Sequence, residues 1–279
     1  MVPDVNHPSG RGILPAAAPP ALVVHPRGQR ASRFSGVDRR RGAVTYGSRM
    51  TVRAVIFDAY GTLFDVYSVA ALGEALFPGH GERLAAVWRD KQVEYSRLVT
   101  MSGGPGPGGS EHYRPFWALT RDALRYAARL LDLPWSTDVE DRLMSEYRQL
   151  RAFPENRDVL VELRRRQVPT AILSNGDPQM LTAAVRAAGL AELLDHVISV
   201  DTVRRYKTDP AAYALGTTAL GLPADQIMFV SSNCWDAIGA TWFGYRTLWV
   251  NRAGLPLDPL GTTPTHIGTT LHDVLALVA

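Results

Sequence analysis

The sequence predicts an α/β protein whose core is a Rossmann-like parallel sheet, with a helical cap domain inserted after the first strand. Short apolar, β-branched runs alternate with helix-like segments over residues 157–250, and a further run of this kind precedes the insertion at residues 53–57. Strands that alternate with helices indicate a parallel sheet covered on both faces. Residues 68–151 interrupt the alternation, because their periodic segments are all helix-like.

The individual elements follow from these patterns. Strands are predicted at residues 53–57, 170–173, 196–200, 227–230 and 246–250. Helices are predicted at residues 157–167, 178–188, 210–220 and 235–243 in the core, and at 69–76, 82–100, 117–131 and 139–151 in the insertion. The Gly-Gly-Pro-Gly-Pro-Gly-Gly run at residues 103–109 suits neither helix nor strand, so it is predicted to be a loop.

Residues 1–49 form a basic tail that we expect to be disordered. They contain eight Arg and two acidic residues, a net charge of 8 − 2 = +6, which leaves 3 − 6 = −3 for residues 50–279. The tail is rich in Pro, Gly and Ala and has no apolar periodicity. It could be a targeting peptide or a flexible basic arm, but we favour a third interpretation, that the mature protein starts at Met50. The predicted core is then residues 50–67 and 152–279, and the predicted cap 68–151.

The composition indicates a globular protein of the cytoplasm. Of the 279 residues 46% are hydrophobic, and no apolar run reaches the length of about 18 residues that a membrane span needs. Because the excess positive charge belongs to the tail, we expect no nucleic-acid partner. A single cysteine, Cys234, fits a reducing compartment, and it has no partnered His that would make it a nucleophile. The seven His lack the spacing of a zinc site.

Polar residues directly follow four of the predicted strands: Asp58, Ser174-Asn175, Asp201 and Ser231-Ser232-Asn233. One such residue would mean little, since any strand can run into a polar turn. Four groups at the carboxyl ends of parallel strands, where open α/β sheets bind ligands, indicate a site for a small molecule. A helical cap over such a site can exclude water.

Asp58 is followed by Ala-Tyr-Gly-Thr-Leu-Phe-Asp, which resembles the first motif of the haloacid dehalogenase superfamily. In that superfamily the first Asp is the nucleophile, and in its phosphatases a second Asp two positions later is the general acid and base. Tyr60 occupies that second position here. A leaving alkoxide needs a proton, whereas halide is a weak base and leaves unaided, so the loss suits carbon–halogen cleavage.

The segment Ser-Ser-Asn-Cys-Trp-Asp at residues 231–236 resembles the Ser-Ser-Asn-x-Trp-Asp motif of the L-2-haloacid dehalogenases, and it is the most specific match in the chain. Phosphatases of the superfamily place acidic residues after this strand, because magnesium prefers several charged oxygen ligands. Only Asp236 is acidic here. The resemblance therefore implies a metal-independent enzyme without a cofactor.

The resemblance covers most of residues 51–254 and implies roles residue by residue. The implied catalytic residues are the nucleophile, the lysine that balances its charge, two orienting hydroxyls and the pair that places and activates water: Asp58, Lys207, Thr62, Ser231, Asn233 and Asp236. The implied substrate-binding residues hold the carboxylate, receive the halide or lie near the pocket: Ser174, Arg89, Asn175, Phe116, Tyr60, Tyr213, Ser232 and Trp235. Singly, Arg89 would more often be a surface residue and Phe116 a core residue. The order and spacing of these residues along the chain match the family's motifs together, and this match favours a role in the active site over a structural role.

The resemblance implies an (S)-2-haloacid dehalogenase, a hydrolase of carbon–halide bonds. Asp58 displaces halide from C2 of a short (S)-2-haloalkanoate and forms a covalent ester, and water then attacks the ester to release the (R)-2-hydroxy acid. Similar enzymes are often homodimers. Three alternatives stay open: opening of a strained ring such as azetidine-2-carboxylate, a magnesium-dependent phosphatase, and a non-catalytic binding protein on the same fold.

Four features depart from the family's pattern. Asp90 stands where Gln is common, Arg97 where an aromatic residue is usual, and Thr208 where Pro usually follows the lysine. The Gly/Pro loop at residues 103–109 is longer than the family's. Three of the four lie on the predicted cap, which shapes the pocket, so they bear on the substrate more than on the chemistry.

Excess EDTA is expected to leave turnover unchanged, because the acidic residues that would hold magnesium are missing after the fourth core strand. The measurement is the rate of halide release from 2-chloropropionate before and after chelation. A loss of activity that magnesium restores would contradict the predicted mechanism.

Overall fold

The computed structural model describes residues 51–278 except 105 and 107, so the predicted tail at residues 1–49 lies outside the described residues. Six parallel strands form one sheet in the order β3-β2-β1-β4-β5-β6. They are β1 (Ala54–Phe57), β2 (Thr170–Ser174), β3 (His196–Ser199), β4 (Ile227–Ser231), β5 (Arg246–Val250) and β6 (His266–Gly268). Every residue of β1, β2 and β4 is buried, as expected of a parallel sheet covered on both faces.

The five predicted strands are confirmed to within one residue at each end, and the sixth was missed. β6 is three residues long, lies at the edge of the sheet beside β5 and is partly exposed. A run this short and this exposed carries no apolar pattern that sequence reasoning could detect.

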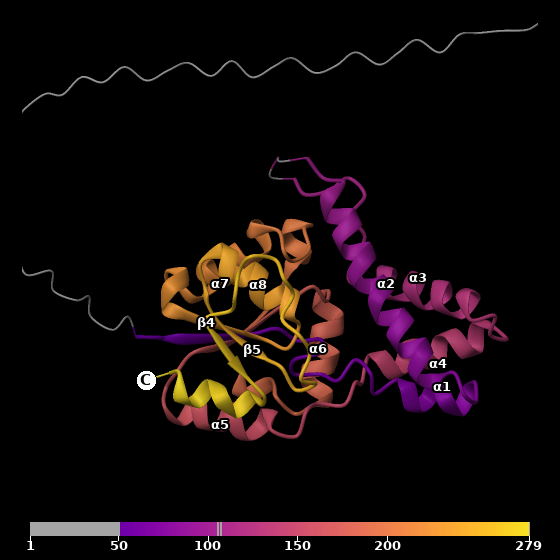
Figure 1. Ribbon diagram of the computed structural model, residues 1–279, viewed down its shortest axis with the longest axis horizontal. Helices are drawn as coiled ribbons and strands as arrows, with labels where there is room; N and C mark the ends of the chain where they lie inside the picture. Colours follow the sequence, from indigo (N-terminus) through magenta and orange to yellow (C-terminus); the bar gives the residue numbers. More distant parts are fainter. Residues whose placement is uncertain (1–50, 105, 107, 279) are drawn as a thin grey trace, which may run out of the picture. The chain divides into compact units, whose positions relative to one another are not determined.

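Four helices cover the sheet, close to their predicted ranges: α5 (Asn156–Arg165), α6 (Pro178–Ala187), α7 (Pro210–Leu220) and α8 (Cys234–Phe243). Figure 1 shows α7 and α8 on one face of the sheet and α5 on the other. Because crossovers between parallel strands are right-handed, α6, which leads outward from β2 to β3, covers the same face as α5. Helices α6 and α7 both begin with an Asp-Pro pair, in which the Asp side chain caps the first turn.

The segment between β1 and α5 contains four helices, which are α1 (Ala70–Leu76), α2 (Gly81–Met101), α3 (Phe116–Leu130) and α4 (Thr137–Tyr147). Buried polar groups join three of them. Trp88 Nε1 donates to the carbonyl of Thr120 at 2.7 Å, and the Gln92 side chain accepts from Tyr147 at 3.1 Å and donates to Thr120 at 3.2 Å. The predicted helical insertion is thus confirmed, and we propose that the cap spans residues 68–151.

Helix α4 differs from the prediction of residues 139–151. It starts earlier because the Ser136 hydroxyl accepts a hydrogen bond from the amide of Val139, which caps the first turn. It ends at Tyr147, and the chain then returns to the core. The described residues of the Gly/Pro loop lie outside helices and strands, as predicted. None of the described helices is both long and apolar enough to cross a membrane.

The strand order places the end of β1 at the point where the crossovers diverge. β1 pairs with β2 on one side and with β4 on the other, with Phe57 opposite Ile172 and Val230. Chains of this topology bind ligands at that switch point, beyond the carboxyl ends of the strands. Asp58 is the residue that follows β1 there.

Candidate active site

Asp58 is buried, with 5% of its surface exposed. Its Oδ1 accepts a hydrogen bond from Lys207 Nζ at 3.0 Å. Its Oδ2 accepts from Asn233 Nδ2 at 2.8 Å, from Thr62 Oγ1 at 3.0 Å and from Ser231 Oγ at 3.4 Å. Four donors around one carboxylate orient it and stabilise its negative charge. The structure therefore brings together five of the side chains that the sequence predicted for the site.

Lys207 lies between two carboxylates and is almost fully buried. Its Nζ donates to Asp58 Oδ1 at 3.0 Å and to Asp236 Oδ2 at 2.9 Å. Burial alone would lower the pKa of Lys207, but the carboxylates of Asp236 and Asp58 outweigh burial, and the pKa is raised. Burial raises the pKa of Asp236 to about 6, although Lys207 acts in the opposite direction. The lysine therefore stays charged beside Asp58.

Arg89 brings a second cation to Asp58 from cap helix α2. Its Nη2 donates to the carbonyl of Tyr60 at 3.1 Å and to Asn233 Oδ1 at 3.3 Å, and the residue is buried. Asn233 Nδ2 donates to the same Tyr60 carbonyl at 3.1 Å as well as to Asp58. One amide side chain thus connects the cap arginine to the core carboxylate.

A small cavity of about 10 Å³, the room of roughly one water molecule, lies beside Asp58. It is lined by Asp58, Tyr60, Arg89, Val93, Ser96, Phe116, Ser174, Asn175 and Trp235. Val93 and Ser96 were not predicted. They lie four and seven residues after Arg89 on α2, so helical spacing is the signal that would have found them.

Tyr60 belongs to an aromatic wall of this cavity. Its ring stacks on Tyr147 with centroids 5.7 Å apart, and it lies 6.2 Å from the rings of both Phe64 and Phe116. Burial, together with Tyr147 and Asp177, raises the pKa of Tyr60 well above its ordinary value. Its phenol is therefore neutral, and the ring contributes shape to the cavity.

The end of β2 and the loop after it contribute Ser174 and Asn175 to the cavity lining. Ser174 Oγ accepts from the amide of Gly176 at 3.1 Å, and Asn175 Oδ1 accepts from the amide of Lys207 at 2.9 Å. A Cβ at Gly176 would lie 2.7 Å from Tyr60 Cε2, so only glycine lets the loop approach that ring. Side-chain bonds of Ser174 and Asn175 thus order the loop that carries them.

Two of the predicted substrate-binding residues take a different position. Of the residues described, those that line the cavity do not include Tyr213 or Ser232. The Tyr213 hydroxyl donates to Asp236 Oδ1 at 2.7 Å, and Ser232 Oγ accepts from Arg252 Nη1 at 2.6 Å. Successive residues after a strand point in opposite directions, so Ser231 faces Asp58 and Ser232 faces away. In this structure both side chains hold other residues of the site, and their predicted role in substrate binding stays a prediction.

Arg252 was missed by the sequence analysis. It follows β5 and donates to Glu155 Oε1 at 2.8 Å, to the carbonyl of Thr62 at 3.1 Å and to Ser232 Oγ. Its guanidinium also lies 4.0 Å from the ring centroid of Phe153. It therefore ties the turn after β1 to the loop after β4. Its sequence context resembles nothing catalytic, so no local signal pointed to it.

A wider groove of about 500 Å³ adjoins the cavity and shares Arg89, Val93 and Trp235 with it. Asp90 and Arg97, two of the departures from the family's pattern, line this groove. The Arg97 guanidinium lies 5.0 Å from the ring centroid of Trp235. Both departures therefore lie outside the cavity, in the groove that adjoins it.

Comparison with known proteins assigns the family. Residues 52–244 match the model of the haloacid dehalogenase-like hydrolases. The chain is 43% identical over 226 residues to an (S)-2-haloacid dehalogenase of Pseudomonas sp. (strain YL), covering 81% of this chain and 94% of that protein. It is 40% identical over 228 residues to haloacetate dehalogenase H-2 of Moraxella sp. (strain B), covering 82% and 98%. The chain belongs to the haloacid dehalogenase-like hydrolases.

Solved structures agree with this assignment. A crystal structure of an L-2-haloacid dehalogenase is 56% identical, with a TM-score of 0.78, and the match covers 82% of this chain and 99% of that one. The L-2-haloacid dehalogenase of Xanthobacter autotrophicus with chloropropionic acid covalently bound is 36% identical, with a TM-score of 0.73, over 81% and 98%. The similarity extends over core and insertion alike.

Lys207→Met is expected to destabilise the fold by ~3–5 kcal/mol near neutral pH, because it leaves Asp58 and Asp236 buried with like charges and no cation between them. The carboxyl pKa values then rise in the folded variant, so the folded state binds more protons than the unfolded chain does. The destabilisation therefore shrinks as the pH falls toward about 5.

Urea unfolding at about pH 7.5 and about pH 5 measures this difference. Lys91→Met is the matched control, since Lys91 pairs with Glu94 on the surface of α2 and its loss should change stability little. A destabilisation of Lys207→Met that does not depend on pH contradicts the argument.

Proposed function

We propose that this protein hydrolyses the carbon–halogen bond of short (S)-2-haloalkanoates, such as 2-chloropropionate, to (R)-2-hydroxy acids. The observation that carries the proposal is the environment of Asp58. Its carboxylate lines a small cavity together with the Arg89 guanidinium and is held by Lys207 and three neutral donors. A fixed carboxylate facing a closed, cationic cavity suits nucleophilic displacement of an anion. The names of the relatives support the same reaction.

In the first step an Asp58 oxygen attacks C2 of the substrate in line with the halogen. The new oxygen–carbon bond forms as the carbon–halogen bond breaks, and the halide leaves with its electron pair. Arg89, Asn175 and Phe116 line the cavity and would receive the halide, while Ser174 would bind the substrate carboxylate. Lys207 balances the charge of Asp58 before attack, and Thr62 and Ser231 orient it.

In the second step water attacks the carbonyl carbon of the Asp58 ester. The bond between that carbon and the substrate-linked oxygen breaks, so the hydroxy acid leaves with an oxygen that came from Asp58. Asn233 is placed to hold the water, since its amide already reaches Asp58. Asp236 takes a proton from the attacking water and returns a proton to the departing oxygen, which becomes the hydroxyl of the product, with Tyr213 orienting the Asp236 carboxylate.

The groove next to the cavity supports a route for the substrate. Trp235 and Arg89 belong to both spaces, and Arg97 lies over the Trp235 ring. An anionic substrate that passes along the groove meets Arg97 before Arg89. The replacement of an aromatic residue by Arg97 therefore acts on capture of the substrate and leaves the reacting groups unchanged.

The alternatives have less support. A phosphatase would need a general acid at the position of Tyr60, and the raised pKa of this buried phenol makes it a poor proton donor. A phosphatase would also need further acidic ligands around Asp58. Within the described part of the chain, no three acidic, His or Cys side chains are grouped as metal ligands. Ring opening of azetidine-2-carboxylate would use the same machinery, and a binding protein would not need it. Halide release from each enantiomer of 2-chloropropionate, with and without chelator, tests the dehalogenase function against these alternatives.

Two broader proposals accompany the reaction. We expect the protein to act in the cytoplasm, and we expect it to form a homodimer, as similar enzymes often do. We expect neither a nucleic acid nor a membrane to be a partner of this protein. Light scattering of the purified protein tests the dimer.

A single turnover in oxygen-18 water is expected to leave the label mainly on Asp58, and multiple turnovers to carry it into the hydroxy acid. The reason is that the product oxygen comes from the carboxylate, which water then refills. Mass spectrometry of the product and of the Asp58 peptide measures both. Label in the product of the first turnover would mean that water attacks the substrate directly.

Tyr213→Phe is expected to move the acid limb of kcat to higher pH. Protonated Asp236 cannot take a proton from water, so kcat should fall as the pH drops through its pKa of about 6. The Tyr213 hydrogen bond lowers that pKa, and its loss, worth ~1 kcal/mol, should raise it by ~0.7 unit. The measurement is kcat against pH for both proteins. An unmoved acid limb would exclude Asp236 as the titrating group.

A further inference from the structure

Helix α3 lacks an N-terminal cap of its own. Its first turn follows Pro115, which makes no side-chain capping bond, and no acidic residue lies in that turn. The first amides of a helix have no partner within the helix, and they carry the positive end of its dipole. The amide of Trp117, the second residue of α3, therefore needs an acceptor from elsewhere.

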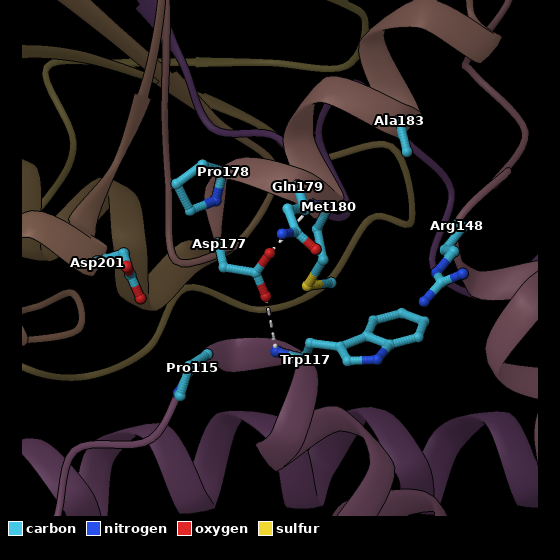
Figure 2. Close-up of a pocket in the computed structure, with 9 residues that line it drawn as sticks. All are labelled: Pro115, Trp117, Arg148, Asp177, Pro178, Gln179, Met180, Ala183 and Asp201. Carbon is cyan, nitrogen blue, oxygen red and sulfur yellow. Dashed lines mark hydrogen bonds between the residues drawn. The ribbon is translucent and has the colours of Figure 1, made fainter.

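The acceptor is Asp177 of the core, and it serves two helices at once. Its Oδ1 accepts from the amide of Met180 at 3.1 Å and so caps its own helix, α6. Its Oδ2 accepts from the amide of Trp117 at 3.1 Å, across the boundary between core and cap. Figure 2 shows the carboxylate between the start of α6 and the Trp117 backbone. Asp177 is 8% exposed, so water competes little for these bonds.

The bond borders a cleft on one side, and on the other side the start of α3 is also tied to the core. The Tyr206 hydroxyl donates to the Arg114 carbonyl at 2.5 Å, and the Tyr113 hydroxyl donates to Asp201 at 2.6 Å. The cleft, of about 640 Å³, is lined by Pro115, Trp117, Arg148, Asp177, Pro178, Gln179, Met180, Ala183 and Asp201. Figure 2 shows Pro178, Gln179 and Ala183 on one side of the cleft and Trp117 on the other. Among these ties, the bond to Asp177 is the one that reaches the start of α6, directly after the loop that carries Ser174 and Asn175.

Both partners of the bond adjoin residues of the cavity. Phe116, which lines the cavity and lies 6.2 Å from the Tyr60 ring, immediately precedes Trp117. Asn175, which also lines it, is two residues before Asp177. The carboxylate thus connects the cap wall of the cavity to its core wall.

We propose that Asp177 is a positioning residue of the active site, which fixes Phe116 against the loop after β2 and so sets the width of the substrate cavity. The proposal rests on the proposed dehalogenase function for its kinetic consequences. Without the bond, the end of α3 that carries Phe116 loses its tie to the start of α6, and the cavity discriminates less between short and longer substrates.

Asp177→Ser separates this role from ordinary helix capping. Serine is a good N-cap, so its hydroxyl keeps the bond to the Met180 amide, but a single oxygen on a shorter side chain cannot also reach Trp117. The KM for 2-chloropropionate should rise about tenfold, while kcat changes less than threefold, because Asp58 and its donors are untouched. The preference for 2-chloropropionate over 2-chlorobutyrate should fall as the cavity loosens.

A double-mutant cycle with Phe116→Leu tests whether Asp177 acts through Phe116. If it does, Asp177→Ser should add little to the KM of the Phe116→Leu enzyme. Asp177→Asn should resemble Asp177→Ser, since an amide offers one oxygen for two donors. Ser136→Ala, which removes the cap of α4 outside the cavity, is the control and should leave KM unchanged.

Amide hydrogen exchange gives a readout that is independent of activity. In protein labelled with nitrogen-15 at Trp and Met, the Trp117 amide should exchange at least tenfold faster in Asp177→Ser, and the Met180 amide at its original rate. Unchanged exchange at Trp117, or additive effects in the cycle, overturns the proposal. If the unaltered enzyme releases no halide, the proposed function fails; if it does and Asp177→Ser leaves KM unchanged, only the positioning role fails.

Discussion

The structure depends on one buried group of charges, the Lys207 ammonium between the carboxylates of Asp58 and Asp236. Each of these ions would be strongly destabilising if it were buried alone, so all three must be held in place together. They come from the end of β1, from the first turn of α8 and from the segment before α7. A slip of β1 against β4 by one residue would turn Asp58 away from Ser231, so the strand register and the charges require each other.

The choice of lysine at this position has a physical reason. The chain contains only two lysines and uses arginine at its other cationic positions. The space between the two carboxylates is narrow, with the ammonium 3.0 Å and 2.9 Å from them, and the ring of Phe229 lies 4.8 Å away. A compact ammonium fits such a space, whereas a planar guanidinium with five donors would leave several unsatisfied.

The cap completes the balance of charge. The core alone presents two carboxylates and one ammonium, and Arg89 from α2 adds the second cation. An anionic substrate and a departing halide both need a nearby cation. That cation must not be an ion-pair partner of Asp58, because Asp58 has to keep its negative charge for the attack. Because this cation lies on helix α2 of the insertion, the core holds Lys207 between its own carboxylates and the insertion supplies Arg89.

The sequence by itself determined the order of five of the six strands and of the helices between them, the helical insertion, and Asp58, Lys207 and Asn233 as residues of one site. These follow from local periodicity, from turns and from motifs, all of which are properties of neighbouring residues. Only the tertiary structure decided that Ser232 turns toward Arg252, that Tyr213 supports Asp236, and that Asp177 caps a helix of the other domain. Side-chain direction after a strand and contacts across 20 or more residues depend on packing between separate segments, and no local pattern encodes them.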